Sequence, residues 1–150
     1  MTKKKPNVLI TGASSGIGEA LARHYAITGA GTLFISGRNR ERLETVKTAC
    51  ERYNVKVYAE VMDVTDRQNT AAWIKKCEEI APLNIVYANA GVATLEETPE
   101  NIYNTFNTNV IGVLNTLIPA VEIFKNRRDK HKTLVITSSI AGYHGLPSCP

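Results

Sequence analysis

The sequence predicts one α/β domain in three layers, with a doubly wound parallel sheet of strand order 3-2-1-4-5 between two layers of helices. Its 150 residues, 43% of them hydrophobic and 21% charged, suit a single globular domain. Short apolar runs rich in β-branched residues alternate with longer stretches of helical period, which is typical of right-handed βαβ crossovers. Several of these runs are apolar without interruption, as strands that are covered on both faces require.

Five runs are predicted as strands because they are short, apolar and bounded by turn-forming residues. They are residues 7–11, 32–36, 55–61, 83–87 and 133–137. In this strand order a crevice forms where the carboxyl ends of the first and fourth strands meet, and ligands of such sheets bind there. We therefore expect the functional residues at the carboxyl ends of the strands.

The segments between these runs carry apolar residues at steps of three and four, which predicts helices. One helix is expected to begin near Gly16, directly after the first strand. Two more are expected over residues 41–53 and 70–80. The longest should begin with Thr98 as N-cap and Pro99 at the first helical position, and Pro119 should bend it. Its expected core-facing stripe is Ile102, Phe106, Val110, Val113, Leu117, Val121 and Phe124.

The formal net charge of +4 arises from two local clusters, at residues 3–5 and 125–132. The first is interpreted as a frayed terminus and the second as a surface turn. Neither contains interleaved aromatic residues that could stack on bases, so nucleic-acid binding is not expected. No apolar run approaches the roughly 20 residues that span a bilayer, and no signal-peptide pattern follows the basic N-terminus. These features favour a cytoplasmic protein with no membrane span.

The three cysteines, Cys50, Cys77 and Cys149, form no CxxC pair and have no matching histidine spacing. They are interpreted as free thiols in a reducing compartment. Neither a disulfide framework nor a metal site is expected.

The strongest functional signal is a glycine-rich turn between the first strand and its helix. It reads Thr11-Gly12-Ala13-Ser14-Ser15-Gly16-Ile17-Gly18. Glycines in such a turn let the backbone approach a pyrophosphate, and the helix N-terminus supplies free N–H groups and a favourable dipole. The candidate phosphate-binding residues are Gly12, Ser14, Ser15, Gly16, Ile17 and Gly18. A glycine-rich turn without a ligand is the alternative.

Four motifs in chain order resemble the classical short-chain dehydrogenase/reductases. They are the TGxxxGxG turn, Ala88-Asn89-Ala90-Gly91 after the fourth strand, Asn109–Gly112 as Asn-x-x-Gly, and Ile136-Thr137-Ser138-Ser139 at the end of the fifth strand. The resemblance covers essentially the whole chain. It implies a Rossmann domain that uses NAD or NADP to interconvert a carbonyl and an alcohol in a small-molecule substrate, and a homo-oligomer when the protein is full length.

The end of the second strand bears on the choice of cofactor. An acidic residue there accepts from the ribose 2′-hydroxyl of NAD, whereas a basic residue accommodates the 2′-phosphate of NADP. The segment reads Ser36-Gly37-Arg38-Asn39-Arg40, with no acid before Glu41. NADP is therefore favoured over NAD, with Arg38 as its phosphate ligand and Ser36 or Asn39 as helpers. The alternative is that Arg38 is a solvated residue at the start of the next helix.

The resemblance assigns two further segments to the cofactor. Asp63 and Val64 match the position that holds the adenine ring, although Asp63 could instead cap the following helix. Asn89, Ala90 and Gly91 match the segment that passes beneath the nicotinamide ribose, and this segment also ties the central strands together.

The resemblance also implies catalytic roles for two residues. Ser139 matches the serine that orients the carbonyl, with Ser138 as a neighbouring candidate, and Asn109 matches the asparagine of the water relay. The alternatives are a strand-end hydroxyl that satisfies backbone groups and an amide that bonds within a helix.

The family's catalytic Tyr and Lys, spaced as YxxxK, do not occur in these 150 residues. The segment 141–147, which contains Tyr143, resembles the one between the family's Ser and Tyr, so the Tyr is expected just beyond Pro150. We therefore interpret residues 1–150 as an NAD(P)-binding Rossmann domain that is incomplete at its C-terminus and catalytically inactive alone. One alternative is a noncatalytic nucleotide-binding or interaction module. Another is a sugar-nucleotide epimerase or a methyltransferase.

Overall fold

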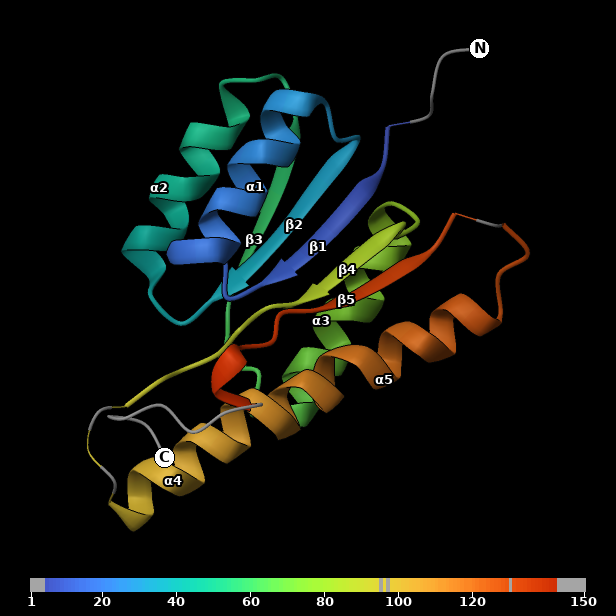
Figure 1. Ribbon diagram of the computed structural model, residues 1–150. Helices are drawn as coiled ribbons and strands as arrows, with labels where there is room; N and C mark the ends of the chain where they lie inside the picture. The colour runs from blue at the N-terminus through green and yellow to red at the C-terminus, as the bar shows by residue number, and fades with distance from the viewer. Residues whose placement is uncertain (1–4, 95, 97, 130, 143–150) are drawn as a thin grey trace.

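The computed structural model describes residues 5–94, 96, 98–129 and 131–142. It contains a five-stranded parallel sheet in the order β3-β2-β1-β4-β5, which confirms the predicted topology (Figure 1). The strands are β1 Asn7–Thr11, β2 Thr32–Gly37, β3 Lys56–Val61, β4 Ile85–Ala88 and β5 Thr133–Ile136. Each predicted strand is present, with ends that differ from the prediction by at most two residues.

Helices cover both faces of the sheet (Figure 1). They are α1 Gly16–Thr28, α2 Arg40–Glu51, α3 Arg67–Ile80, α4 Pro99–Phe106 and α5 Gly112–Lys125. Alternate residues of each central strand enter two separate cores: Leu33 and Ile35 pack on the side of α1 and α2, whereas Phe34 packs with Trp73 of α3. Within the described part of the chain, no helix has the length and apolarity needed to cross a membrane.

The long helix predicted from residue 98 begins as expected but is interrupted. Thr98 is the N-cap, its hydroxyl accepts from the Asn101 N–H at 3.2 Å, and Pro99 follows at the first position. The pattern then changes to one turn of π-helix, η1 Asn107–Ile111, before α5 begins. α5 continues across Pro119, so the break in the α-helical pattern lies at η1 and the prediction had placed the bend too late.

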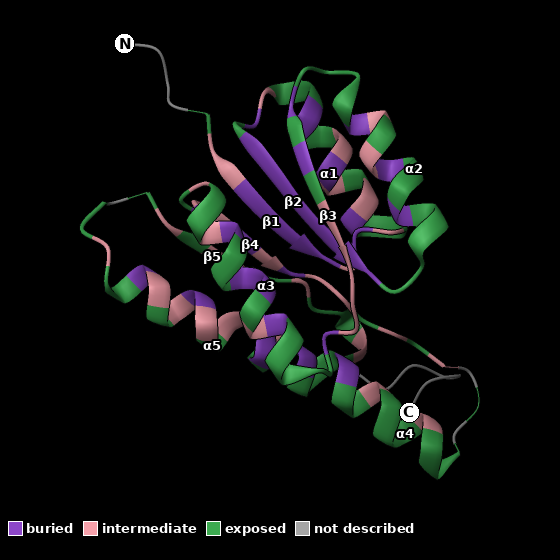
Figure 2. Ribbon diagram, turned by 180° about the vertical axis from the view of Figure 1, so that it is seen from behind, coloured by how far each residue is buried: buried purple, intermediate pink, exposed green. Residues whose placement is uncertain are grey.

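The predicted core-facing stripe of this helix is largely wrong. Ile102, Phe106 and Val110 are 58%, 57% and 40% exposed, and of the predicted stripe only Phe124 is buried. Figure 2 shows α4 as mainly exposed. The buried face consists of small and polar residues together with Phe124: Thr108, Gly112, Asn115, Thr116, Ala120 and Phe124. The extra residue of the π turn shifts the helix face, and close approach favours residues without bulk.

Two contacts show how closely α5 packs on the segment after β3. A Cβ atom added at Gly112 would lie 2.5 Å from Val64 Cγ2, so only glycine fits there. The Asn115 side-chain amide donates to the Val64 carbonyl at 2.9 Å, which satisfies a buried backbone acceptor. Together these contacts fix the position of Val64 at the carboxyl end of the sheet.

The basic segment 125–132 is more than a solvated turn, which corrects the sequence-based interpretation. Arg127 Nη1 donates to both Glu78 carboxylate oxygens at 3.1 Å and to the Leu83 carbonyl at 2.6 Å. Its Nε and Nη2 donate to Asp129 at 2.8 and 2.6 Å, and this pairing lowers the pKa of Asp129 from its usual value. Lys132 Nζ donates to the Phe124 and Arg127 carbonyls, so the cluster joins α3, α5 and the start of β5.

Replacing this arginine should therefore destabilise the domain without touching the pocket. Arg127→Met is expected to reduce the free energy of unfolding by about 2 kcal/mol, because Glu78 and the Leu83 carbonyl lose a charged donor in a half-buried position. Thermal and urea unfolding would measure the loss. Arg128→Met, at the exposed neighbouring position, is the matched control, and equal stability of the two variants would contradict the assignment.

Candidate functional site

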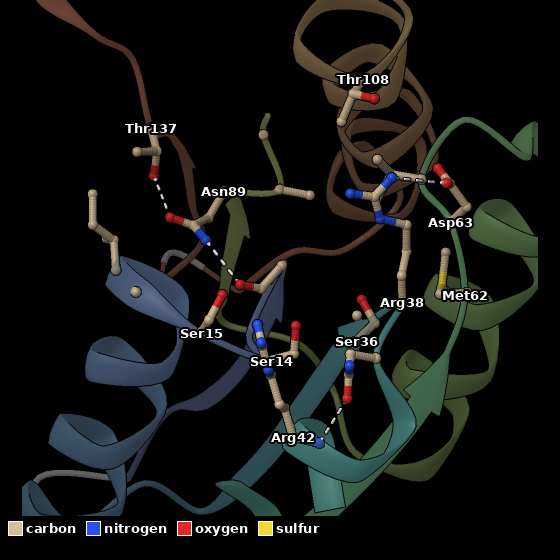
Figure 3. Close-up of a pocket in the computed structure, with 18 residues that line it drawn as sticks. Ser14, Ser15, Ser36, Arg38, Arg42, Met62, Asp63, Asn89, Thr108 and Thr137 are labelled. Carbon is tan, nitrogen blue, oxygen red and sulfur yellow. Dashed lines mark hydrogen bonds and ion pairs between the residues drawn. The ribbon is translucent and has the colours of Figure 1, made fainter. Parts of the chain in front are cut away.

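A cleft of about 400 Å³ opens at the carboxyl ends of the strands (Figure 3). All the predicted cofactor-binding residues except Gly18 line it: Gly12, Ser14, Ser15, Gly16, Ile17, Arg38, Asp63, Val64, Asn89, Ala90 and Gly91. Ser36, Gly37, Asn39, Arg42, Met62, Thr108 and Thr137 complete the lining. The cleft therefore lies where the strand order predicts a ligand site.

The glycine-rich turn after β1 forms one wall of the cleft. Gly12 and Gly16 have φ angles of +68° and +57°, which L side chains rarely adopt. Ser15 is the N-cap of α1, and its side chain makes no capping hydrogen bond. The N–H groups at the start of α1 consequently receive no side-chain cap, which suits an anionic group at the helix N-terminus.

Gly18 lies behind this wall, and its role is steric. A Cβ atom there would collide with the Gly12 carbonyl oxygen and lie 2.6 Å from Asn89 Nδ2. The absence of a side chain lets the first turn of α1 pack directly on the turn after β1. Gly18 thus shapes the phosphate-binding turn from outside the cleft.

Asn89 connects the carboxyl ends of three strands. Its Nδ2 donates to the Thr11 carbonyl at 3.0 Å, and its Oδ1 accepts from Thr137 Oγ1 at 3.0 Å. Its backbone N–H and that of Ala90 donate to Thr11 Oγ1, which in turn donates to the Tyr87 carbonyl. The expected structural role of this segment is therefore visible as a hydrogen-bond network across β1, β4 and the end of β5.

The opposite side of the cleft carries an ion pair between Arg38 and Asp63. Arg38 Nη1 lies 3.7 Å from Asp63 Oδ2, and both side chains are well exposed. Asp63 Oδ1 accepts from the N–H and the hydroxyl of Thr65, whereas the N-cap of α3 is Asp66. Asp63 therefore stabilises a local turn and does not cap the helix, and its Oδ2 faces Arg38.

Two hydroxyl groups in the lining have no hydrogen-bond partner although they are buried. They are Ser36 Oγ and Thr108 Oγ1, in residues 1% and 3% exposed. Buried polar groups are normally satisfied, so these two hydroxyls are available to a polar ligand. With the open glycine turn, they fit a nucleotide that supplies hydroxyl, phosphate and ring-nitrogen groups.

The two predicted catalytic residues, Asn109 and Ser139, lie outside the cleft lining and are exposed. The Asn109 amide pairs with the Val92 peptide in both directions, with Val92 N–H to Oδ1 and Nδ2 to the Val92 carbonyl both at 2.8 Å. Asn109 thus anchors the chain that follows Gly91, from a π turn and not from a regular helix. Ser139 Oγ accepts from the Ala141 N–H at 3.1 Å. Tyr143 lies outside the described residues.

The remaining reactive groups do not contribute to the cleft. Tyr25 donates to or accepts from Tyr87 at 2.8 Å, and burial together with this bond raises the pKa of Tyr25 to about 12. Burial likewise raises the pKa values of the Cys50 and Cys77 thiols, which are free. No group of three or more His, Cys, Asp or Glu residues in the described ranges could hold a metal ion.

Sequence reasoning missed three residues of the lining: Arg42, Thr108 and Thr137. Arg42 follows the Asn39 N-cap by three residues, a helical step that returns it to the same side, so its signal was present. Thr108 gave no signal because the π turn that directs it inward has no sequence signature in the periodicity.

The chain matches the family described as short chain dehydrogenase over residues 6–150. An oxidoreductase of Myxococcus xanthus (strain DK1622), named as uncharacterized, is 34% identical over 143 residues, which are 92% of this chain and 55% of that protein. The alcohol dehydrogenase of the archaeon Thermococcus sibiricus, solved with 5-hydroxy-NADP, superimposes with a TM-score of 0.85 at 29% identity, covering 97% of this chain and 63% of that one.

A short chain dehydrogenase/reductase of Burkholderia phymatum, solved with NAD, has a TM-score of 0.86 at 24% identity and shares the fold, covering 99% of this chain and 54% of that one. The chain therefore spans a little over half the length of these relatives. The family match extends over nearly the whole chain, and the glycine turn, the Asn89 network and the strand order agree with it. The chain belongs to the short chain dehydrogenase family.

Proposed function

We propose that the chain is the cofactor-binding part of an NADP-dependent oxidoreductase that interconverts a carbonyl and an alcohol in a small molecule. One observation carries the proposal: the glycine turn and a basic, acid-free end of β2 line a single cleft. The solved relative from Thermococcus sibiricus, with its NADP derivative, supports a nicotinamide cofactor. Free buried thiols are in keeping with a cytoplasmic location, which is part of this proposal.

The nicotinamide supplies the hydride chemistry when it is bound, and the protein binds and orients it. The N-terminus of α1, preceded by the turn from Gly12 to Gly16, is the place for the pyrophosphate. Val64 and Thr108 are placed to contact the adenine, with Asp63 at its edge. The segment from Asn89 to Gly91 supports the nicotinamide ribose.

Ser139 is proposed to orient the carbonyl oxygen of the substrate, and Asn109 to support the proton relay. Because the Asn109 amide already pairs with Val92, its side chain acts by fixing that segment. The 150 residues contain no YxxxK pair, so a Tyr and Lys that move the proton are not among them. The proposal for hydride transfer therefore concerns a full-length protein that supplies both.

Replacing Arg38 provides the test of cofactor preference. Arg38→Ala is expected to weaken NADPH binding about tenfold and to leave NADH binding within twofold, because only NADPH carries the phosphate that a guanidinium can bind. Fluorescence or calorimetric titration of the purified protein would measure both affinities. Equal affinities for NADH and NADPH in the unmodified protein, unchanged by the substitution, would overturn the NADP assignment.

A noncatalytic nucleotide-binding or interaction module is the second candidate, favoured by the missing YxxxK pair. Both functions predict nucleotide binding, so turnover distinguishes them. Steady NADPH oxidation with a panel of aldehydes and ketones by the full-length protein would establish the enzyme. NADPH binding with no oxidation of NADPH and no reduction of NADP by alcohols would establish the module. A homo-oligomer of the full-length enzyme is part of the first proposal.

A further inference from the structure

Two arginines enter the cleft near the end of β2, and they point in different directions. Figure 3 shows Arg38 directed toward Asp63, with which it forms the 3.7 Å ion pair, and Arg42 directed toward Ser14 on the glycine turn. The guanidinium of Arg42 forms no ion pair or hydrogen bond with any residue that the structure describes. Arg42 is thus an uncompensated positive charge at the cleft wall.

The local structure holds Arg42 in this position. Asn39 is the N-cap of α2, and its side-chain oxygen accepts from the Arg42 N–H at 2.9 Å. The cap fixes the first turn of α2, and the side chain of Arg42 leaves that turn on the cleft side. Glu41, the acidic residue of the same turn, is not part of the cleft lining. A carboxylate therefore does not compete for Arg42 within the cleft.

The space between Arg42 and the glycine turn is kept open by Gly37. A Cβ atom at Gly37 would lie 3.0 Å from Ser14 Oγ and 3.1 Å from Ser14 Cβ, so a larger residue would displace Ser14. Ser36, directly before Gly37, contributes its unpartnered, 1% exposed hydroxyl to the same cleft. The wall at this point thus offers a guanidinium and two hydroxyls, and no carboxylate other than Asp63, which Arg38 occupies.

We propose that Arg42, together with Ser14, is a specificity-determining ligand of the 2′-phosphate, in addition to Arg38. The inference rests on the proposed function, because it assumes that a nucleotide occupies the cleft. A phosphate monoester carries close to two negative charges near neutral pH and binds guanidinium groups through paired hydrogen bonds. Arg42 meets the phosphate from the side of α2 and the glycine turn, whereas Arg38 meets it from the side of Asp63. A nucleotide without the phosphate leaves Arg42 without a ligand.

The test compares two adenine nucleotides that differ in one phosphate position. 2′,5′-ADP carries the 2′-phosphate, and 5′-AMP lacks it. Arg42→Gln is expected to weaken binding of 2′,5′-ADP at least tenfold, while 5′-AMP binding changes by less than twofold. Arg42→Lys, which keeps the charge but loses the planar fork, should weaken 2′,5′-ADP binding by an intermediate factor. Isothermal titration calorimetry on the purified protein would measure the affinities.

Arg40→Gln is the matched control, because Arg40 is an exposed arginine of the same helix that lines a different hollow on α1 and α2. Its 2′,5′-ADP affinity should equal that of the unmodified protein. If Arg42→Gln behaves like Arg40→Gln, or weakens both nucleotides equally, the role of Arg42 is wrong and the proposed function stands. If the unmodified protein binds neither nucleotide, the proposed function fails and the inference fails with it.

Discussion

Gly18→Ala is expected to lower nucleotide affinity about 100-fold and the melting temperature by about 6–10 °C. The added methyl group would meet the Gly12 carbonyl oxygen and would lie 2.6 Å from Asn89 Nδ2, and neither atom can move freely. Overpacking of this kind costs about 1–3 kcal/mol, and a domain of this length melts about 2–4 °C lower per kcal/mol. Displacing the glycine turn would also remove about two charge-assisted hydrogen bonds to the pyrophosphate, which corresponds to about 100-fold in affinity.

Gly16→Ala separates the steric effect from a general effect of glycine replacement. A Cβ atom at Gly16 meets nothing within 4 Å, although its φ of +57° makes alanine strained. The variant should therefore lose only about 1 kcal/mol of stability. Differential scanning fluorimetry and NADPH titration would be applied to both variants. If Gly18→Ala were no less stable than Gly16→Ala, the close packing of α1 on the glycine turn would not be a determinant of the fold.

The topology could be predicted because strand and helix signals alternate clearly along the chain. β1 and β2 are continuous apolar runs and are fully buried, as a sheet covered on both faces demands. The start of α4 could be predicted because Thr98 and Pro99 form a local signal that depends on no distant contact. Such signals act through the backbone of a few neighbouring residues, so tertiary packing does not override them.

The orientation of α5 could not be predicted in the same way. Periodicity assigns the large apolar residues to the core, but here close contact with Val64 and α3 selects Gly112, Asn115 and Thr116. The π turn at Asn107–Ile111 adds a residue and changes the face, and nothing in the apolar pattern signals it. Val110 and Leu114, which the apolar pattern favours as core residues, are 40% and 45% exposed in the described chain.

The candidate site was predictable where one segment of backbone forms it. The glycine turn combines a strand, a turn and a helix within 12 residues of sequence from Asn7 to Gly18, so its position follows from local structure. Contributions that depend on the direction of a side chain were harder to foresee. Arg38 was expected to face a phosphate and pairs with Asp63 in this structure, whereas Arg42 was overlooked and faces the glycine turn.

The Asn89 network should be essential for the stability of the domain even without a nucleotide. Asn89→Ala is expected to reduce the free energy of unfolding by about 3 kcal/mol, because it leaves the Thr11 carbonyl and the Thr137 hydroxyl without their partners in a part-buried site. The melting temperature of the nucleotide-free protein should fall by about 6–10 °C. Asn104→Ala, at an exposed position of α4, is the control and should have no measurable effect.

A double-mutant cycle with Thr137→Val distinguishes the network from a cofactor contact. Thr137→Val removes only the hydroxyl that donates to Asn89 Oδ1, so the two single losses should exceed the loss in the double variant by about 1 kcal/mol. The coupling should be the same with and without NADPH, because the bond joins β4 to the end of β5 within the protein. A coupling that appears only when NADPH is present would mean that Asn89 acts through the nucleotide, and the strand-tying role would then be wrong.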